Sequence, residues 1–276
     1  MVKQIVGLAV ISIGILLLVF NGIGTIFRSV PTYLSPVTTP AVFRPSAYNE
    51  LLKAFVKDDF VDYARLKSSP LLQKSLDELA KVSAQKMLDP KEQLSYWLNA
   101  YNLLTLKIIC DRYPITNLEQ QLGNDTNARK FNVGGQMMSV QDIMIQKIIP
   151  LLRTTDPRYL FFICGGAVGH PALLDHPIEP DKMDSDMEVA SFKWISHPRN
   201  VRYDDITQTL YVSPFLNWYN QVLSTRYENP FEFVIPYLDE RMQTVAHKAA
   251  TIKSFGQRFN WTLNDLALKE KLTAGK

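Results

Sequence analysis

The chain has 276 residues, of which 46% are hydrophobic and 21% are charged, a composition typical of a globular protein and not of a disordered or collagen-like chain. Its 30 basic and 27 acidic residues give a net charge of +3, which is too even to favour electrostatic binding of nucleic acid. The two cysteines, Cys110 and Cys164, exclude a disulfide framework and a four-thiolate zinc site.

The amino-terminal segment is predicted to cross a membrane. Residues 4–27 contain no charged side chain, and as a helix they would span a hydrocarbon core of roughly 30 Å. A cleaved signal peptide is the alternative, but its apolar core would be shorter, and no small-residue cleavage site stands out before Arg28. Lys3 precedes the apolar run, which favours a cytoplasmic amino terminus. We expect a single-pass membrane protein whose globular domain lies on the exported side.

A proline-rich tether follows the anchor. Its prolines fix φ and discourage a helix, and no helical period connects the residues between them. The chain therefore divides into an anchor over residues 1–27, a tether over 28–46 and one globular domain over 47–276. The prolines of the tether are Pro31, Pro36, Pro40 and Pro45.

The globular part begins with helical patterns. Apolar residues at helical spacing predict helices over 51–56 and 71–82. The strongest helix comes next, because Asp89 is a suitable cap, Pro90 fits the first helical position and Glu92 lies three residues beyond the cap. Its pattern predicts one apolar face that continues to Tyr113-Pro114.

The later elements are mixed, which indicates the α+β class: a mainly helical single domain with short strands and hairpins, preceded by one transmembrane helix. Gly134-Gly135 is typical of a tight hairpin turn. An apolar run after Asp156-Pro157 favours a buried strand. In chain order we expect a hairpin of 131–133 with 136–139, a helix over 140–152, a strand over 159–164, a helix over 178–196 and a hairpin of 201–203 with 209–212.

The predicted core helix carries a motif that is similar to the signature helix of the domain-of-unknown-function 547 family. The motif is YWLNAYNLLT at residues 96–105. Further pieces resemble the family in the same order, so that the resemblance covers residues 90–265. They are Asp156-Pro157-Arg158, the glycine turn after the apolar run (Gly165, Gly166 and Gly169), Leu210-Tyr211-Val212-Ser213, Trp218-Tyr219 and NWTLN at 260–264. The family has no established activity, so the resemblance implies a fold more than a reaction.

The family's pattern places a histidine before the glycine turn and cysteines within it, followed by a proline. Aligned on Ala167 and Pro171, this chain has Leu160 at the histidine position. Gly165 then stands at the first cysteine and His170 at the second. The resemblance therefore implies that the reactive positions of the family are replaced here.

A second alignment gives the same result. If Cys164 is matched with the first cysteine, Tyr159 falls where the histidine would be. The family also carries a Glu-His pair after the first hairpin, where this chain has Met144 and Ile145. We expect a divergent, membrane-anchored member of the family in which the candidate reactive residues are replaced.

Asn99 and Asn102 are polar residues on an otherwise apolar helix and need an explanation, because Asn is a mediocre helix former. One interpretation is structural, with buried amides that bind backbone groups. The other is functional, since a carboxamide supplies donors and an acceptor for a ligand. The structural interpretation is favoured, and both residues are kept as candidate ligand-binding residues.

Cys164 and His170 are the candidate catalytic pair. A thiol reacts as thiolate and needs a base or cation nearby, and His170 is the one histidine close in sequence. Gly165 and Gly166 would let backbone amides approach a substrate oxygen, although they would equally allow a turn without strain. A free cysteine is more often a small buried hydrophobe, which is the expectation for Cys110.

The remaining chemistry is sparse. Arg158 is either paired with a carboxylate or binds an anionic ligand, and no cofactor motif or metal-ligand spacing occurs, so we predict no cofactor and no metal. Two functions stay open. The favoured one is a membrane-tethered binding or interaction module for an unknown small-molecule, peptide or protein ligand, without nucleic acid. The alternative is a thiol-dependent hydrolase or acyl-transferring enzyme that uses Cys164 with His170.

Overall fold

The structure is a computed structural model that describes residues 43–228, 232–247, 251–254 and 259–273. These described residues belong to one compact unit. The predicted anchor over 1–27 and the tether as far as residue 42 lie outside the described residues and stay predictions. Within the described part, every helix is too short or too polar to cross a membrane.

The first described elements pack around a short hairpin. Helix α2 (Ser46–Phe55) lies against α4 (Pro70–Lys81), which agrees with the two predicted amphipathic helices. Between them the chain forms β1 (Val56–Lys57), β2 (Phe60–Val61) and α3 (Tyr63–Leu66). The hairpin turn was not predicted, because Asp58 and Asp59 adopt φ values of 48° and 74° without a glycine.

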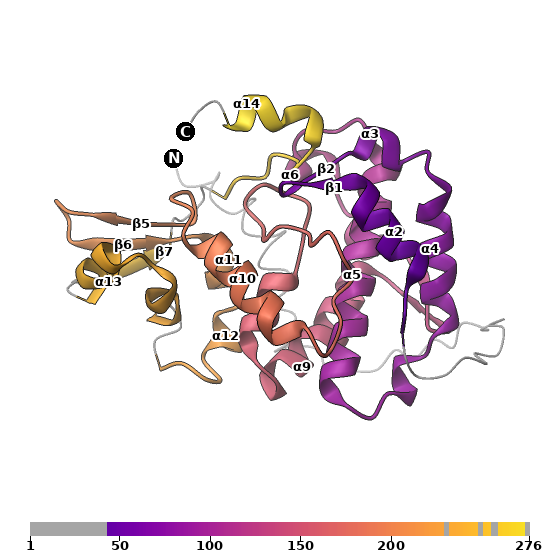
Figure 1. The fold of residues 1–276 in the computed structure, drawn as a ribbon, viewed down its shortest axis with the longest axis horizontal. Helices are drawn as coiled ribbons and strands as arrows, with labels where there is room; N and C mark the ends of the chain where they lie inside the picture. The colour runs from indigo at the N-terminus through magenta and orange to yellow at the C-terminus, as the bar shows by residue number, and fades with distance from the viewer. Residues whose placement is uncertain (1–42, 229–231, 248–250, 255–258, 274–276) are drawn as a thin grey trace, which may run out of the picture. The chain divides into compact units, whose positions relative to one another are not determined.

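Helix α5 (Pro90–Arg112) is the central helix of the unit and confirms the strongest prediction (Figure 1). Asp89 caps it by accepting a hydrogen bond of 2.7 Å from the backbone N–H of Lys91. The expectation of a single apolar face was wrong, since 15 of its 23 residues are buried and α4, α8 and α9 all pack against it. A helix enclosed in this way needs partners for its buried polar side chains.

A hairpin and a bent helix follow α5. The short helices α6 (Leu118–Gln121) and α7 (Asp125–Ala128) lead to a hairpin of β3 (Phe131–Val133) with β4 (Gln136–Met138), joined by Gly134-Gly135 as predicted. The predicted helix over 140–152 is present as α8 (Val140–Ile143), the π-helical turn η2 (Met144–Ile148) and α9 (Ile149–Thr154). The π-helical turn precedes Pro150, whose nitrogen cannot donate to the regular helical ladder.

The predicted strand over 159–164 was wrong. Pro157–Phe162 form a 3₁₀ helix, η3, which begins with Asp156 as the cap and Pro157 in its first turn. The apolar run is buried on all sides, so its hydrophobicity carries no period that could separate a strand from a helix. Asp156 as a cap and Pro157 in the first turn are typical of the start of a helix, and they were the signals in the sequence that favoured η3 over a strand.

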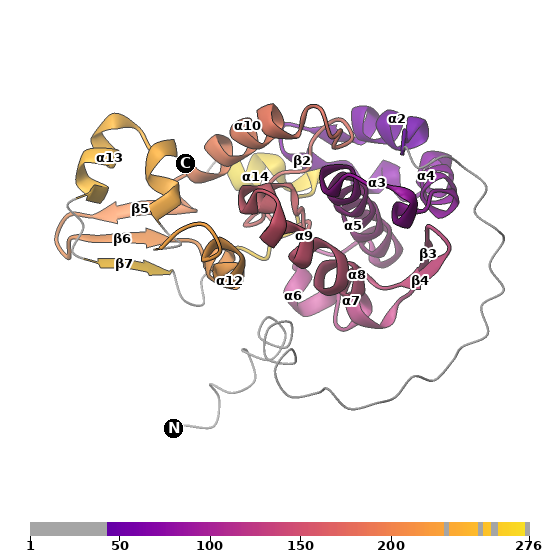
Figure 2. The ribbon, with the colours of Figure 1, turned by 90° about the horizontal axis from the view of Figure 1, so that it is seen from below.

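The carboxyl-terminal part combines short helices with a three-stranded sheet, and α13 lies beside that sheet in Figure 2. The strand order is β5-β6-β7, with β5 antiparallel and β7 parallel to β6. The predicted helix over 178–196 begins only at residue 183, after Pro180. The bounds are α10 (Met183–Ile195), β5 (Val201–Asp204), β6 (Thr209–Val212), α11 (Pro214–Trp218), α12 (Asn220–Leu223), η4 (Glu232–Tyr237), α13 (Glu240–His247), β7 (Thr251–Ser254), η5 (Leu266–Leu268) and α14 (Lys269–Thr273). The unit is thus mainly helical with short strands, as the α+β class predicts.

Candidate functional site

A cleft of about 570 Å³ lies between the β1–β2 turn, the segment after the glycine turn and the carboxyl-terminal part of α10. His170 and Asn264 both line it, and its other walls carry apolar side chains from all three segments. The cleft therefore adjoins the glycine turn, where the sequence places its candidate reactive residues.

His170 is enclosed by an aromatic cluster that we define as Phe215, Trp218, Phe259 and Trp261, with ring-centroid distances to the imidazole of 4.8 to 6.2 Å. Burial lowers the pKa of His170 to about 3, so the ring is neutral near pH 7. Its Nδ1 atom is buried and has no hydrogen-bond partner among the described residues.

The glycine turn makes room for this arrangement. A Cβ atom on Gly165 would lie 2.4 Å from Cε1 of His170, so a side chain there would collide with the ring. Gly166 has a φ of 80°, and a Cβ atom on it would lie 2.4 Å from Cδ1 of Ile109. Both glycines are required by packing, and Gly166 also by its backbone conformation.

Cys164 lies at the start of the turn with 4% of its surface exposed. Burial, with a smaller contribution from Asp59, raises the pKa of its thiol to about 11, although a hydrogen bond from the backbone of Gly166 acts in the opposite direction. Within the described residues, no hydrogen bond joins this thiol to the ring of His170. The structure places the two predicted catalytic residues on either side of one turn without connecting them.

The second cysteine, Cys110, is also buried, near the end of α5. Burial, followed by Asp111, raises the pKa of its thiol to about 12. Its position agrees with the expected role of core filling.

Asn99 and Asn102 both bind backbone groups of segments that cross α5. The Asn102 carboxamide donates to Phe162 O at 2.9 Å and accepts from Cys164 N at 3.0 Å. Asn99 donates to Ile178 O at 2.8 Å and accepts from Ile178 N at 3.0 Å. These contacts are those expected from the structural interpretation, and Asn102 joins α5 to the end of η3 and to the first residue of the glycine turn.

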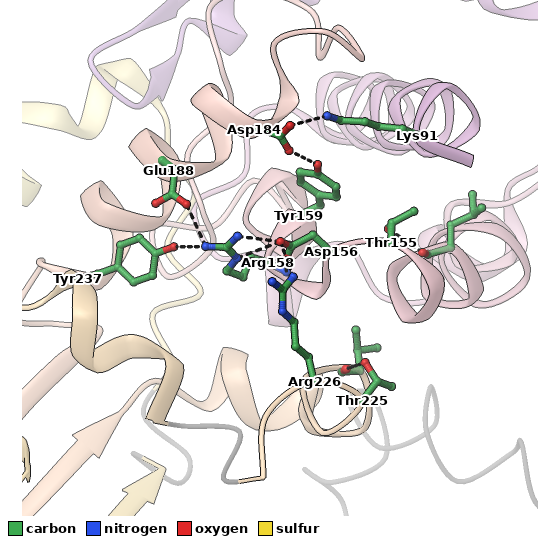
Figure 3. Close-up of polar contacts among 12 residues, drawn as sticks. Lys91, Thr155, Asp156, Arg158, Tyr159, Asp184, Glu188, Thr225, Arg226 and Tyr237 are labelled. Atoms are coloured by element: carbon green, nitrogen blue, oxygen red, sulfur yellow. Dashed lines mark hydrogen bonds and ion pairs between the residues drawn. The ribbon is translucent and has the colours of Figure 1, made fainter. Parts of the chain in front are cut away.

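Arg158 lies in a network of polar contacts outside the cleft (Figure 3). Its guanidinium donates to Asp156 at 2.7 Å and to Glu188 and Tyr237 at 2.9 Å each. Arg226 binds the same Asp156 carboxylate at 2.7 Å. Of the two possibilities left open by the sequence, the structure has Arg158 paired with carboxylates, at the edge of a separate groove of about 590 Å³.

Asn264 is a residue of the cleft that the sequence analysis did not single out. Its side chain is 3% exposed, and Oδ1 accepts a hydrogen bond of 2.8 Å from the hydroxyl of Tyr63. Its backbone binds Gly166 O and Val61 N at 2.9 Å each. The one available signal was its place in the NWTLN stretch at 260–264, which gave no indication of a cleft.

No group of three or more His, Cys, Asp or Glu side chains among the described residues is arranged to hold a metal ion. His176 bridges two carboxylates, with Nδ1 at 2.7 Å from Asp175 and Nε2 at 3.2 Å from Asp186.

Comparison with known proteins gives one finding. Residues 85–195 match the model of a family described as protein of unknown function, DUF547, and form a domain of that family. This region contains α5, the glycine turn and α10, whereas the pieces at 210–213, 218–219 and 260–264 lie beyond it. Neither curated proteins nor solved structures gave a significant match.

Proposed function

We propose that this chain is a membrane-tethered ligand-binding module whose binding site is the cleft beside the glycine turn, with residues 4–27 as its anchor. The observation that supports this most strongly is the state of Cys164 and His170. The thiol has a pKa of about 11 and the imidazole a pKa of about 3, and burial is the first cause of both shifts. A nucleophilic pair needs the opposite shifts, a thiolate beside an imidazolium.

The neighbours of Cys164 fit the same proposal. Burial first, and the nearby Cys164 second, raise the pKa values of the Tyr48, Tyr63 and Tyr101 hydroxyls. These hydroxyls stay neutral near pH 7 and provide no positive charge that would stabilise a thiolate. At that pH a thiol with a pKa near 11 is almost entirely protonated.

The cleft supplies what a binding module requires. Its volume of about 570 Å³ is within the range of small-molecule sites, which runs from roughly 300 to 1,000 Å³. Apolar walls come from Phe60, Leu173 and Trp194, and polar groups come from Asn264 and His170. Such a site can bind a ligand without a covalent step.

Thiol labelling separates this proposal from the enzyme alternative. The full chain with Cys110→Ala, which leaves Cys164 as the only thiol, is treated with iodoacetamide at pH 7.5, and modification is followed by mass spectrometry. Because the thiolate fraction is small, we expect labelling on the order of 10²-fold slower than for the same chain in urea. His170→Ala in this background should leave the slow rate unchanged.

The opposite result would favour the thiol-dependent hydrolase. Labelling of folded Cys164 at the rate of a free thiol, slowed by His170→Ala, would show an activated nucleophile and contradict the binding module. Circular dichroism of each variant verifies that labelling is measured on folded protein.

The anchor is tested separately. We expect the full chain to stay with membranes after an alkaline carbonate wash. Leu17→Arg should reduce this retention, because an arginine at the centre of a spanning helix costs about 2.5–3.5 kcal/mol. A wild-type chain that is released by the wash would contradict the proposed anchor.

A further inference from the structure

Asn264 presents donors to the cleft that nothing in the described part of the chain satisfies. Its backbone N–H donates to Gly166 O, and its backbone carbonyl accepts from Val61 N. Its side-chain Oδ1 accepts a hydrogen bond from the Tyr63 hydroxyl. The two N–H groups on Nδ2 have no hydrogen-bond partner among the described residues, and the side chain lines the cleft. Because the contacts of the backbone and of Oδ1 hold the amide in place while its two N–H groups stay open to the cleft, Nδ2 is suited to donate to a ligand oxygen.

The charges of the cleft favour a negative ligand. Its acidic side chains are already paired, in the pairs Asp58–Lys269, Asp59–Lys193 and Asp175–His176. Arg199 and Lys57 also line the cleft, and neither forms an ion pair within the described residues. With Lys193 and Lys269, these residues give the cleft four basic side chains against the three carboxylates, and this small excess of positive charge attracts an anion toward the cleft.

The walls indicate what the rest of the ligand looks like. Val56, Val168, Leu173 and Trp194 line the cleft with apolar surface. A hydrated inorganic anion would gain nothing from these walls, whereas the hydrocarbon part of an organic acid would bury apolar surface there.

We propose that the cleft binds an organic acid, with its carboxylate accepting hydrogen bonds from Nδ2 of Asn264 and its hydrocarbon part against the apolar walls. This inference rests on the proposed binding function and names the ligand class of that site. Arg199 and Lys57 act by attraction and increase the rate of encounter. The Tyr63 hydroxyl is a positioning group, because its bond to Oδ1 turns Nδ2 toward the ligand.

The test uses three probes with the same hydrocarbon part: hexanoate, hexylamine and hexanol. Binding to the purified full chain is measured by calorimetry, and the side-chain amide resonances of Asn264 are followed by NMR. We expect saturable binding of hexanoate with a shift of these resonances, and weaker binding of the amine and the alcohol. Asn264→Asp keeps an oxygen for Tyr63 but removes both donors, so hexanoate affinity should fall at least about tenfold.

Three further variants show whether a loss of hexanoate binding in Asn264→Asp comes from the missing donors or from misfolding. Asn127→Asp changes the same chemistry on the exposed surface of α7 and should leave hexanoate affinity unchanged within about twofold. Arg199→Gln, at an exposed side chain, should weaken hexanoate binding about three- to tenfold and reduce its dependence on salt. The exposed Arg241→Gln is its matched control.

Three results would overturn the inference. Hexylamine or hexanol binding as tightly as hexanoate would reject the carboxylate while leaving a binding cleft. No hexanoate binding up to about 10 mM would reject an organic acid at this site. Hexanoate binding that Asn264→Asp and Arg199→Gln do not weaken would place it elsewhere. The proposed function is decided separately by the labelling of Cys164.

Discussion

The imidazole of His170 lies over Gly165 so closely that a Cβ atom there would be 2.5 Å from Nε2 and 2.8 Å from Nδ1. Gly165 therefore determines where His170 can lie, and the two positions should be energetically coupled.

Gly165→Ala should lower the free energy of unfolding by about 1–3 kcal/mol, because the added methyl group collides with a ring that the aromatic cluster holds in place. Urea denaturation measures this change. In a His170→Ala background the ring is absent, so the same substitution should cost less. Equal costs in both backgrounds would show that the backbone of Gly165, and not the ring, sets the penalty.

Asn102→Ala should lower the free energy of unfolding by about 2–5 kcal/mol, since it leaves Phe162 O and Cys164 N without their partner in the core. The exposed Asn127→Ala is the control and should change it by less than about 0.5 kcal/mol. A loss of under 1 kcal/mol for Asn102→Ala, measured in urea, would be inconsistent with the structural role of this amide.

The pH dependence of stability should include a contribution from His176. Burial alone would lower its pKa, but the hydrogen bonds to Asp175 and Asp186 outweigh burial and raise it above 6.5. A raised pKa in the folded state stabilises the protein below the unfolded pKa, and this stabilisation is lost as the pH rises through the folded pKa. The loss of stability in His176→Gln should therefore be larger at pH 5.5 than at pH 8.5.

NMR titration tests the cause of that shift directly. In the wild-type chain the ring of His176 should titrate above pH 6.5, and in a variant with Asp175→Asn and Asp186→Asn its pKa should fall. If removal of both carboxylates leaves the pKa of His176 unchanged, the hydrogen bonds to Asp175 and Asp186 are not the cause of its raised pKa.

Asp156→Asn should lower the free energy of unfolding by about 1–3 kcal/mol at pH 7, because Arg158 and Arg226 both lose a charged acceptor. Burial raises the pKa of Asp156, but its bonds to Arg158 outweigh burial and lower the pKa below the ordinary value. The stabilisation is present above the unfolded pKa of about 3.9 and disappears as the pH falls through the folded value. Wild type and variant should thus converge in acid, as urea denaturation at pH 7 and pH 3 can show.

The exposed Asp205→Asn serves as the control for that series. Its difference from the wild type should stay within about 0.5 kcal/mol at both pH values. A similar loss for Asp205→Asn would mean that net charge, and not the network around Asp156, causes the effect.

Local signals in the sequence were sufficient where one residue type determines the backbone. Asp89 and Pro90 locate the start of α5, and Gly134-Gly135 locates the hairpin of β3 and β4. They failed where burial is uniform, as in the apolar run that forms η3. They also failed at the β1–β2 turn, where Asp58 and Asp59 take positive φ in place of glycine.

The candidate site was only partly accessible from the sequence. The glycine turn and His170 could be found because they are close in sequence and chemically distinctive. Asn264 could not, since it reaches the cleft through contacts with Val61, Tyr63 and Gly166, which are far away along the chain. A pattern in sequence carries no information about which side chains from distant segments will meet.

The contacts of Asn264 have a practical consequence for how this protein can be dissected. The region that matches the family covers residues 85–195, yet Asp58, Asp59 and Asn264, which all line the cleft, lie outside it. A recombinant piece cut at 85 and 195 would contain the glycine turn but neither the β1–β2 turn nor Asn264. A recombinant fragment that keeps the whole cleft must therefore extend beyond the family match at both ends.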